Sequence, residues 1–247
     1  MKDIVTFLTE STGMFKNAEN IVDVMCNEII KHKDDIELDD NGYYYIDIEE
    51  EMFKDIPNMF FKEATMVITN QLDSLGMYFV SQSDDEYIIN KWDVENKVFN
   101  WIDIALSYDD LDASEFDEYE ITQTLQHELQ HAYQDWYRYK NNYIKKYIEQ
   151  QKRKPLRGGS IDYYLDKDEF EGFLNNIQRF VKNFKGDMSI QDIFNKKLKY
   201  YDDYLVYKRI YASALDETSN MSNKQRKLAK QYWNKLNNHI YSYITQN

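Results

Sequence analysis

Apolar residues recur at helical spacing in five segments of the chain. The segments are 14–31, 120–150, 166–184, 189–215 and 222–244. Because apolar side chains three or four residues apart share one face of a helix, each segment is predicted to be an amphipathic helix. Ser189 and Ser222 stand at the starts of the last two segments and are predicted to be their N-caps.

Shorter runs before residue 107 have the composition and alternation of β-strands. They are residues 36–38, 43–48, 64–70, 77–81, 86–90 and 98–106. Asn41-Gly42 is predicted to join the first two runs in a hairpin, because this pair favours a positive φ angle. Strands followed by helices indicate an α+β fold, with a small mixed or antiparallel sheet and a helical C-terminal half.

The composition of the 247 residues narrows the class of protein. An aromatic content of 16% excludes intrinsic disorder as the general state, and 2 Pro and 7 Gly favour long helices. A single cysteine, Cys26, excludes an internal disulfide framework and a multi-cysteine zinc site. No apolar run suits a bilayer span or a secretory signal, so we expect a cytoplasmic protein without a membrane partner.

The net charge of −14 is unevenly distributed along the chain. Residues 1–120 have a balance of −22, and residues 121–247 have a balance of +8. We therefore expect an acidic subdomain over 1–120, made of the first helix and the sheet, and a helical subdomain over 121–247 that carries the site described next. The two are expected to form one catalytic domain. The acidic first half argues against nucleic acid as the main partner.

The segment His127-Glu128-Leu129-Gln130-His131 is an H-E-x-x-H motif within the predicted helix that starts near residue 120. Residues four apart lie on one face of a helix, so both imidazoles can bind one metal ion. Zn²⁺ accepts histidine nitrogen and keeps a position for water in catalytic sites. Glu128 is then the predicted general base that takes a proton from the metal-activated water.

Two histidines are too few for a zinc site, and a third protein ligand is expected in the acidic run of residues 166–175. Helical periodicity does not separate Glu169 from Glu171, because both flank the apolar face. His239 is interpreted as a structural or surface residue.

The span from about residue 98 to 176 resembles the zincin metallopeptidases of the gluzincin type, through H-E-L-x-H-A and the later E-F-E-G. The resemblance implies a zincin-like fold, a Zn²⁺ cofactor and hydrolysis of a protein or peptide substrate. It favours Glu171, followed by Gly172, as the third ligand, with Glu169 as the alternative. Asn175 then corresponds to the polar residue that orients a metal-bound histidine, although Asp is more usual there.

The same resemblance implies a tyrosine or histidine that stabilises the oxyanion, for which Tyr163 and Tyr164 are the best candidates. It also implies a strand that binds substrate by strand addition. Residues 98–106 could fill that role or be an ordinary core strand.

Two other functions remain open at this stage. One is a structural or virion-packaged zincin-fold protein without general proteolysis, because MKDIVTFLTEST resembles the short N-terminal segments of proteins packaged in tailed-phage heads. Host cytoplasm or the virion would then be its location. An ordinary disordered N-terminus is the simpler interpretation of these residues. The other function is a highly selective regulatory protease that cuts a single partner.

Overall fold

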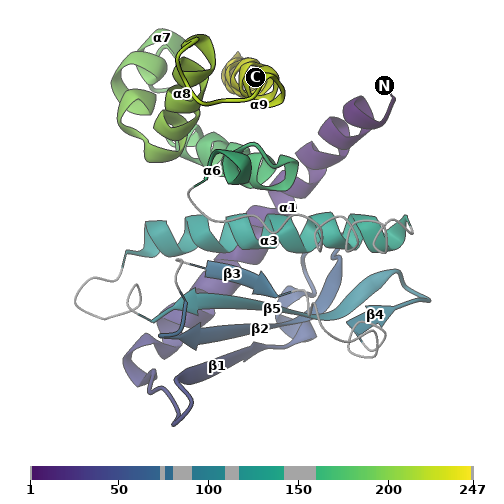
Figure 1. Cartoon of the computed structure of the whole chain (residues 1–247). Helices are drawn as coiled ribbons and strands as arrows, with labels where there is room; N and C mark the ends of the chain where they lie inside the picture. Colours follow the sequence, from purple (N-terminus) through teal and green to yellow (C-terminus); the bar gives the residue numbers. More distant parts are fainter. Residues whose placement is uncertain (1, 73–75, 80–90, 109–116, 142–159, 246–247) are drawn as a thin grey trace. The chain divides into compact units, whose positions relative to one another are not determined.

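A computed structural model describes residues 2–72, 76–79, 91–108, 117–141 and 160–245 (Figure 1). The chain divides into two compact units, Met1–Gln151 and Lys152–Asn247. The first contains a sheet and two long helices, and the described part of the second is helical, so the α+β class is confirmed. We expected a boundary near residue 120, whereas the first unit also includes the helix that carries the H-E-x-x-H motif.

Helix α1, Lys2–His32, opens the first unit. It is longer than the predicted segment 14–31, because residues 2–13 continue the helix. Its buried face includes Ile21, Met25 and Ile29, at the spacing that predicted it. A short 3₁₀ turn, Lys33–Asp35, ends this part of the chain.

Five strands form one mixed sheet among the described residues of the first unit. They are β1 (Tyr43–Ile48), β2 (Phe61–Thr69), β3 (Gly76–Phe79), β4 (Trp92–Asp93) and β5 (Val98–Ser107). The order is β1-β2-β5-β3, with β4 also paired to β5. β2 and β5 are parallel, and the other pairs are antiparallel. A mixed sheet is therefore confirmed, while the predicted strand 86–90 lies outside the described residues.

The predicted hairpin of residues 36–38 with 43–48 is wrong. Residues 36–38 form no strand, and β1 pairs instead with β2, Tyr43 opposite Thr69. The Asp39 carboxylate accepts hydrogen bonds of 2.9 Å from the backbone N–H groups of Asn41 and Tyr43. These two N–H groups are therefore hydrogen-bonded within the turn, in which Gly42 has a φ angle of +82°. The chain can then begin β1 without pairing with residues 36–38.

Strand β5 lies inside the sheet, which bears on the two interpretations of residues 98–106. It pairs with β2 along one side and with β3 and β4 along the other. On the second side, β3 pairs with residues 103–106 and β4 pairs with residues 98–99, so both ends of that side already belong to the sheet. These pairings favour the core-strand interpretation, and substrate addition at 98–106 stays a prediction.

One face of the sheet packs against α1 and α3, the helix Glu118–Lys140. Alternate strand residues such as Met66, Ile102 and Ile104 join Leu125 and Leu129 of α3 in a single buried cluster. The Asp117 carboxylate begins α3 by accepting from the N–H groups of Tyr119 and Glu120. The helix ends at Lys140, earlier than the predicted position near 150.

The second unit is built from helices. They are α5 (Ile161–Tyr164), α6 (Lys167–Lys182), α7 (Ile190–Asp192) with a π turn (Ile193–Lys197) and a 3₁₀ turn (Leu198–Tyr200), α8 (Asp202–Leu215) and α9 (Asn223–Thr245). The predicted continuous helix 189–215 is interrupted at Tyr201, which is extended and stacks on Phe180 with ring centroids 4.1 Å apart. Ser189 and Ser222 accept from backbone N–H groups as predicted N-caps.

Candidate metal centre

The two motif histidines lie one turn apart on α3, with their rings close together. Their Nε2 atoms are 3.1 Å apart, and the ring planes meet at 76°. His127 is 8% exposed and His131 is half-buried. The opposite face of the helix holds Leu125 and Leu129, both fully buried, so core packing fixes the helix that positions the imidazoles.

The spacing of the two Nε2 atoms fits a zinc ion. Zinc–nitrogen bonds of about 2.0–2.1 Å at a tetrahedral angle would set the two nitrogens about 3.3–3.4 Å apart. The observed 3.1 Å corresponds to an angle of about 95–102° at the same bond lengths. A shift of a few tenths of an ångström would close the difference, which is well within ordinary side-chain motion.

A polar residue that the sequence analysis missed contacts His131. The Oε1 atom of Gln134 lies 3.1 Å from Nδ1 of His131, and Gln134 is only 4% exposed. The sequence could have predicted this contact, because residues three apart are neighbours on a helix and Gln134 follows His131 by three. Glu128 follows His127 directly and is 8% exposed, so its carboxylate is also largely shielded from water.

The predicted third-ligand residues lie on α6 in the second unit. Glu171 is 5% exposed, and its Oε1 atom lies 3.7 Å from Nζ of Lys167 and 4.0 Å from Nζ of Lys235. Burial lowers the pKa of Lys235, against the opposing effect of Glu171. The Lys235 ammonium also lies over the Phe170 ring, 5.1 Å from its centroid. Glu171 therefore has two cations beside it within its own unit.

Glu169 lies about 200° from Glu171 around α6, on a different face of the helix. Both Glu169 and Asn175 are half-buried. The first turn of this helix is rich in carboxylates. Asp166 is its N-cap and accepts from the N–H of Asp168 at 2.9 Å. Burial raises the pKa of Asp166, and the charge of Asp168 raises it further. This turn is thus a place where negative charge accumulates.

Tyr163 and Tyr164, the predicted oxyanion candidates, lie on α5 and pack among aromatic rings of the second unit. Their ring centroids are 5.2 Å apart, and Tyr164 also contacts Phe173 at 5.5 Å. The Tyr164 carbonyl accepts a hydrogen bond of 3.0 Å from the Tyr207 hydroxyl. These contacts give both residues a packing role within their unit. Their part in catalysis stays a prediction.

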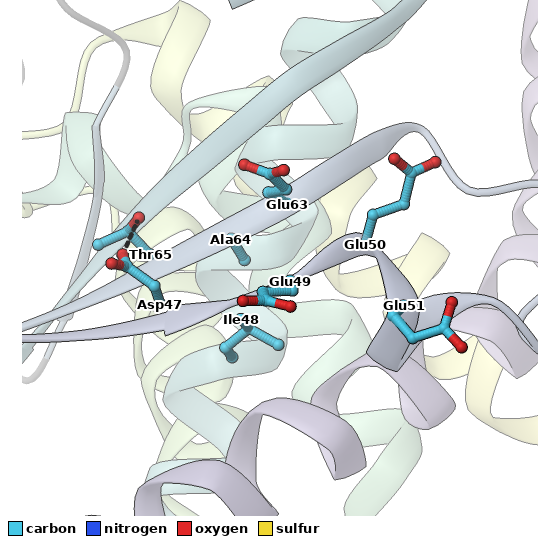
Figure 2. A pocket seen from close by; sticks show the side chains of 8 residues that line it. All are labelled: Asp47, Ile48, Glu49, Glu50, Glu51, Glu63, Ala64 and Thr65. Atoms are coloured by element: carbon cyan, nitrogen blue, oxygen red, sulfur yellow. Dashed lines mark hydrogen bonds between the residues drawn. The ribbon is translucent and has the colours of Figure 1, made fainter.

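A separate hollow in the first unit gathers carboxylates at the start of β2 and the end of β1 (Figure 2). Its acidic residues are Asp47, Glu49, Glu50, Glu51 and Glu63. Asp47 accepts a hydrogen bond of 2.9 Å from Thr65. The lining contains no imidazole or thiol, and these carboxylates do not converge into a metal-binding group within the described part of the chain. The α3 pair is therefore the better candidate for a transition metal.

Searches of protein-family models, curated proteins and solved structures give no match to this chain. Across the described segments, no helix combines the length and apolar character needed to cross a membrane.

Proposed function

We propose that this chain is a zinc-dependent metallopeptidase with a zincin-like fold that hydrolyses a protein or peptide substrate. The observation that carries the proposal is the pair of Nε2 atoms on α3, 3.1 Å apart, with the buried carboxylate of Glu128 next in sequence. The spacing suits two ligands of one zinc ion, and Glu128 follows the first ligand. The mixed sheet beneath α3 supports the zincin-like fold.

Glu169 is the proposed third ligand. His127, His131 and Glu169 would together offer two ring nitrogens and one carboxylate oxygen, which are donor atoms that zinc accepts. Glu171, favoured by the resemblance, already has two ammonium groups within 4.0 Å of its carboxylate. A divalent cation placed there would be repelled by both lysines. The accumulation of carboxylates in the first turn of α6 would instead be relieved by a cation at Glu169.

When bound, zinc would act as a Lewis acid and would make water nucleophilic at neutral pH. Glu128 would accept the proton of the attacking water and pass it to the leaving amine. Its buried position favours this role, because few water molecules compete for the carboxylate. Asn175, Tyr163 and Tyr164 remain proposed for orienting a ligand and stabilising the oxyanion.

Zinc stoichiometry tests the ligand set. Purified wild-type protein should contain about one zinc per chain, Glu169→Ala should lose it, and Glu171→Ala should retain it. The two substitutions are matched controls, because they remove the same group from the same helix. Loss in Glu171→Ala alone would assign the ligand to Glu171. A wild-type protein without zinc under non-chelating conditions would overturn the metal site.

Cleavage of casein by the Glu128→Gln variant tests the chemistry. This variant should keep its zinc and lose hydrolysis, because Glu128 is proposed as a base and not as a ligand. Glu120→Gln makes the same change at an exposed position of the same helix and should remain active. Full activity in Glu128→Gln would refute the mechanism. Zinc without cleavage in the wild type would favour a selective protease or a structural zincin-fold protein.

A further inference from the structure

We infer that Gln134 is a positioning residue that sets the tautomer of His131 and directs its Nε2 lone pair toward the metal. The inference rests on the proposed function, since it concerns how this chain prepares a zinc ligand. Gln134 belongs to α3, the same helix as His131, whereas the resemblance to the gluzincins suggested Asn175 of the second unit for orienting a histidine.

The chemistry of the contact supports this role. The Gln134 Oε1 atom is an amide oxygen and can only accept a hydrogen bond, so at 3.1 Å it is satisfied when His131 carries a proton on Nδ1. A neutral imidazole has one N–H group, and its other nitrogen carries a lone pair that can accept a hydrogen bond or bind a metal ion. With the proton on Nδ1, the lone pair lies on Nε2, the atom that is 3.1 Å from Nε2 of His127. The amide thus selects the tautomer that binds metal.

The position of Gln134 makes the contact preorganised. Gln134 lies one helical turn after His131 and is 4% exposed, so its side chain is already ordered by the fold. Ordering a long side chain at the moment of metal binding would cost entropy, and the buried site avoids that cost. Partners of this kind fix the ring orientation of metal-bound histidines and raise their basicity.

The tautomer can be measured on metal-free wild-type protein by nitrogen NMR of labelled histidines. His131 in its neutral form should be protonated on Nδ1 and unprotonated on Nε2. In Gln134→Met this preference should be lost, while Gln134→Glu should retain it because a carboxylate also accepts. A wild-type His131 protonated on Nε2 would overturn the inference, whether or not the protein binds zinc.

Zinc affinity, measured by competition with a chelator, provides the second readout. Gln134→Met should bind zinc about 10–100-fold more weakly than the wild type, and Gln134→Glu should bind at least as tightly as the wild type. The control is Gln126→Met, which makes the same change at a position that is 2% exposed and about 140° from His131 around α3. Its affinity should equal that of the wild type.

The outcomes separate the two proposals. A wild type that binds zinc, with unchanged affinity in a folded Gln134→Met, would overturn the role of Gln134 and leave the proposed function intact. A wild type that binds no zinc would overturn the proposed function, and the NMR measurement would still decide the tautomer. If Gln134→Met does not fold, the inference is tested by the zinc affinity of Gln134→Glu and by the tautomer of His131 in the wild type.

Discussion

If the chain binds zinc as proposed, removal of the ion should lower the thermal stability of the protein and leave α3 folded. The two Nε2 atoms lie 3.1 Å apart, close to the spacing of two nitrogen ligands of one zinc ion, so binding by this pair needs only a small adjustment of the rings. A ligand at 100 times its dissociation constant stabilises the folded state by about 2.7 kcal/mol. With about 2–4 °C per kcal/mol for a protein of 150–250 residues, the midpoint of unfolding should fall by about 5–11 °C on chelation.

Differential scanning calorimetry and far-UV circular dichroism, each with and without a chelator, measure the two parts of this expectation. His131→Asn is the control, since it should unfold at the temperature of the chelated wild type and respond little to zinc. An unchanged midpoint in the wild type would refute the binding argument. A large loss of helical signal on chelation would refute the argument that core packing, and not the metal, holds α3.

Three further outcomes are expected. Lys91→Met should lower the free energy of unfolding of the first unit in urea by about 3 kcal/mol, because it removes the buried cation 2.9 Å from Asp103. The double variant Lys91→Met with Asp103→Leu should recover most of this loss. Asp117→Ala should cost about 1 kcal/mol by removing the N-cap of α3, and Asp117→Asn should cost less. Burial, and next Lys235, lower the pKa of His239 from 6.5, so stability should fall as the pH drops below that value. His239→Gln should flatten this dependence, and an unchanged slope would contradict the assignment.

The sequence predicted the helix and the helix caps that depend on interactions between residues close together in the chain. The helix that carries His127 and His131 follows from its apolar spacing, and the caps at Ser189 and Ser222 follow from the hydroxyl that each offers to the next turn. The i, i+4 spacing of the motif likewise predicted that the two imidazoles meet, because one helix positions both.

Features that depend on distant residues could not be predicted in the same way. Asn41-Gly42 indicated a turn, but the partner of β1 is β2, which is chosen by matching buried faces and not by the turn. The charge change near residue 120 suggested a boundary, whereas Leu125 and Leu129 pack α3 with the sheet. Tyr201 interrupts a pattern of helical periodicity because its ring stacks on Phe180, a contact between segments far apart in sequence.

The placement of both histidines and Gln134 within eight consecutive residues of α3 has a consequence for the order of folding. Contacts between residues three and four apart form on the timescale of helix growth, before the slower pairing of β2 with β5. A helix is costly to nucleate, and an ion bridging one turn would offset part of that cost. Zinc added during refolding should therefore accelerate the appearance of helical signal, and an ion at the proposed site would then also assist the folding of α3.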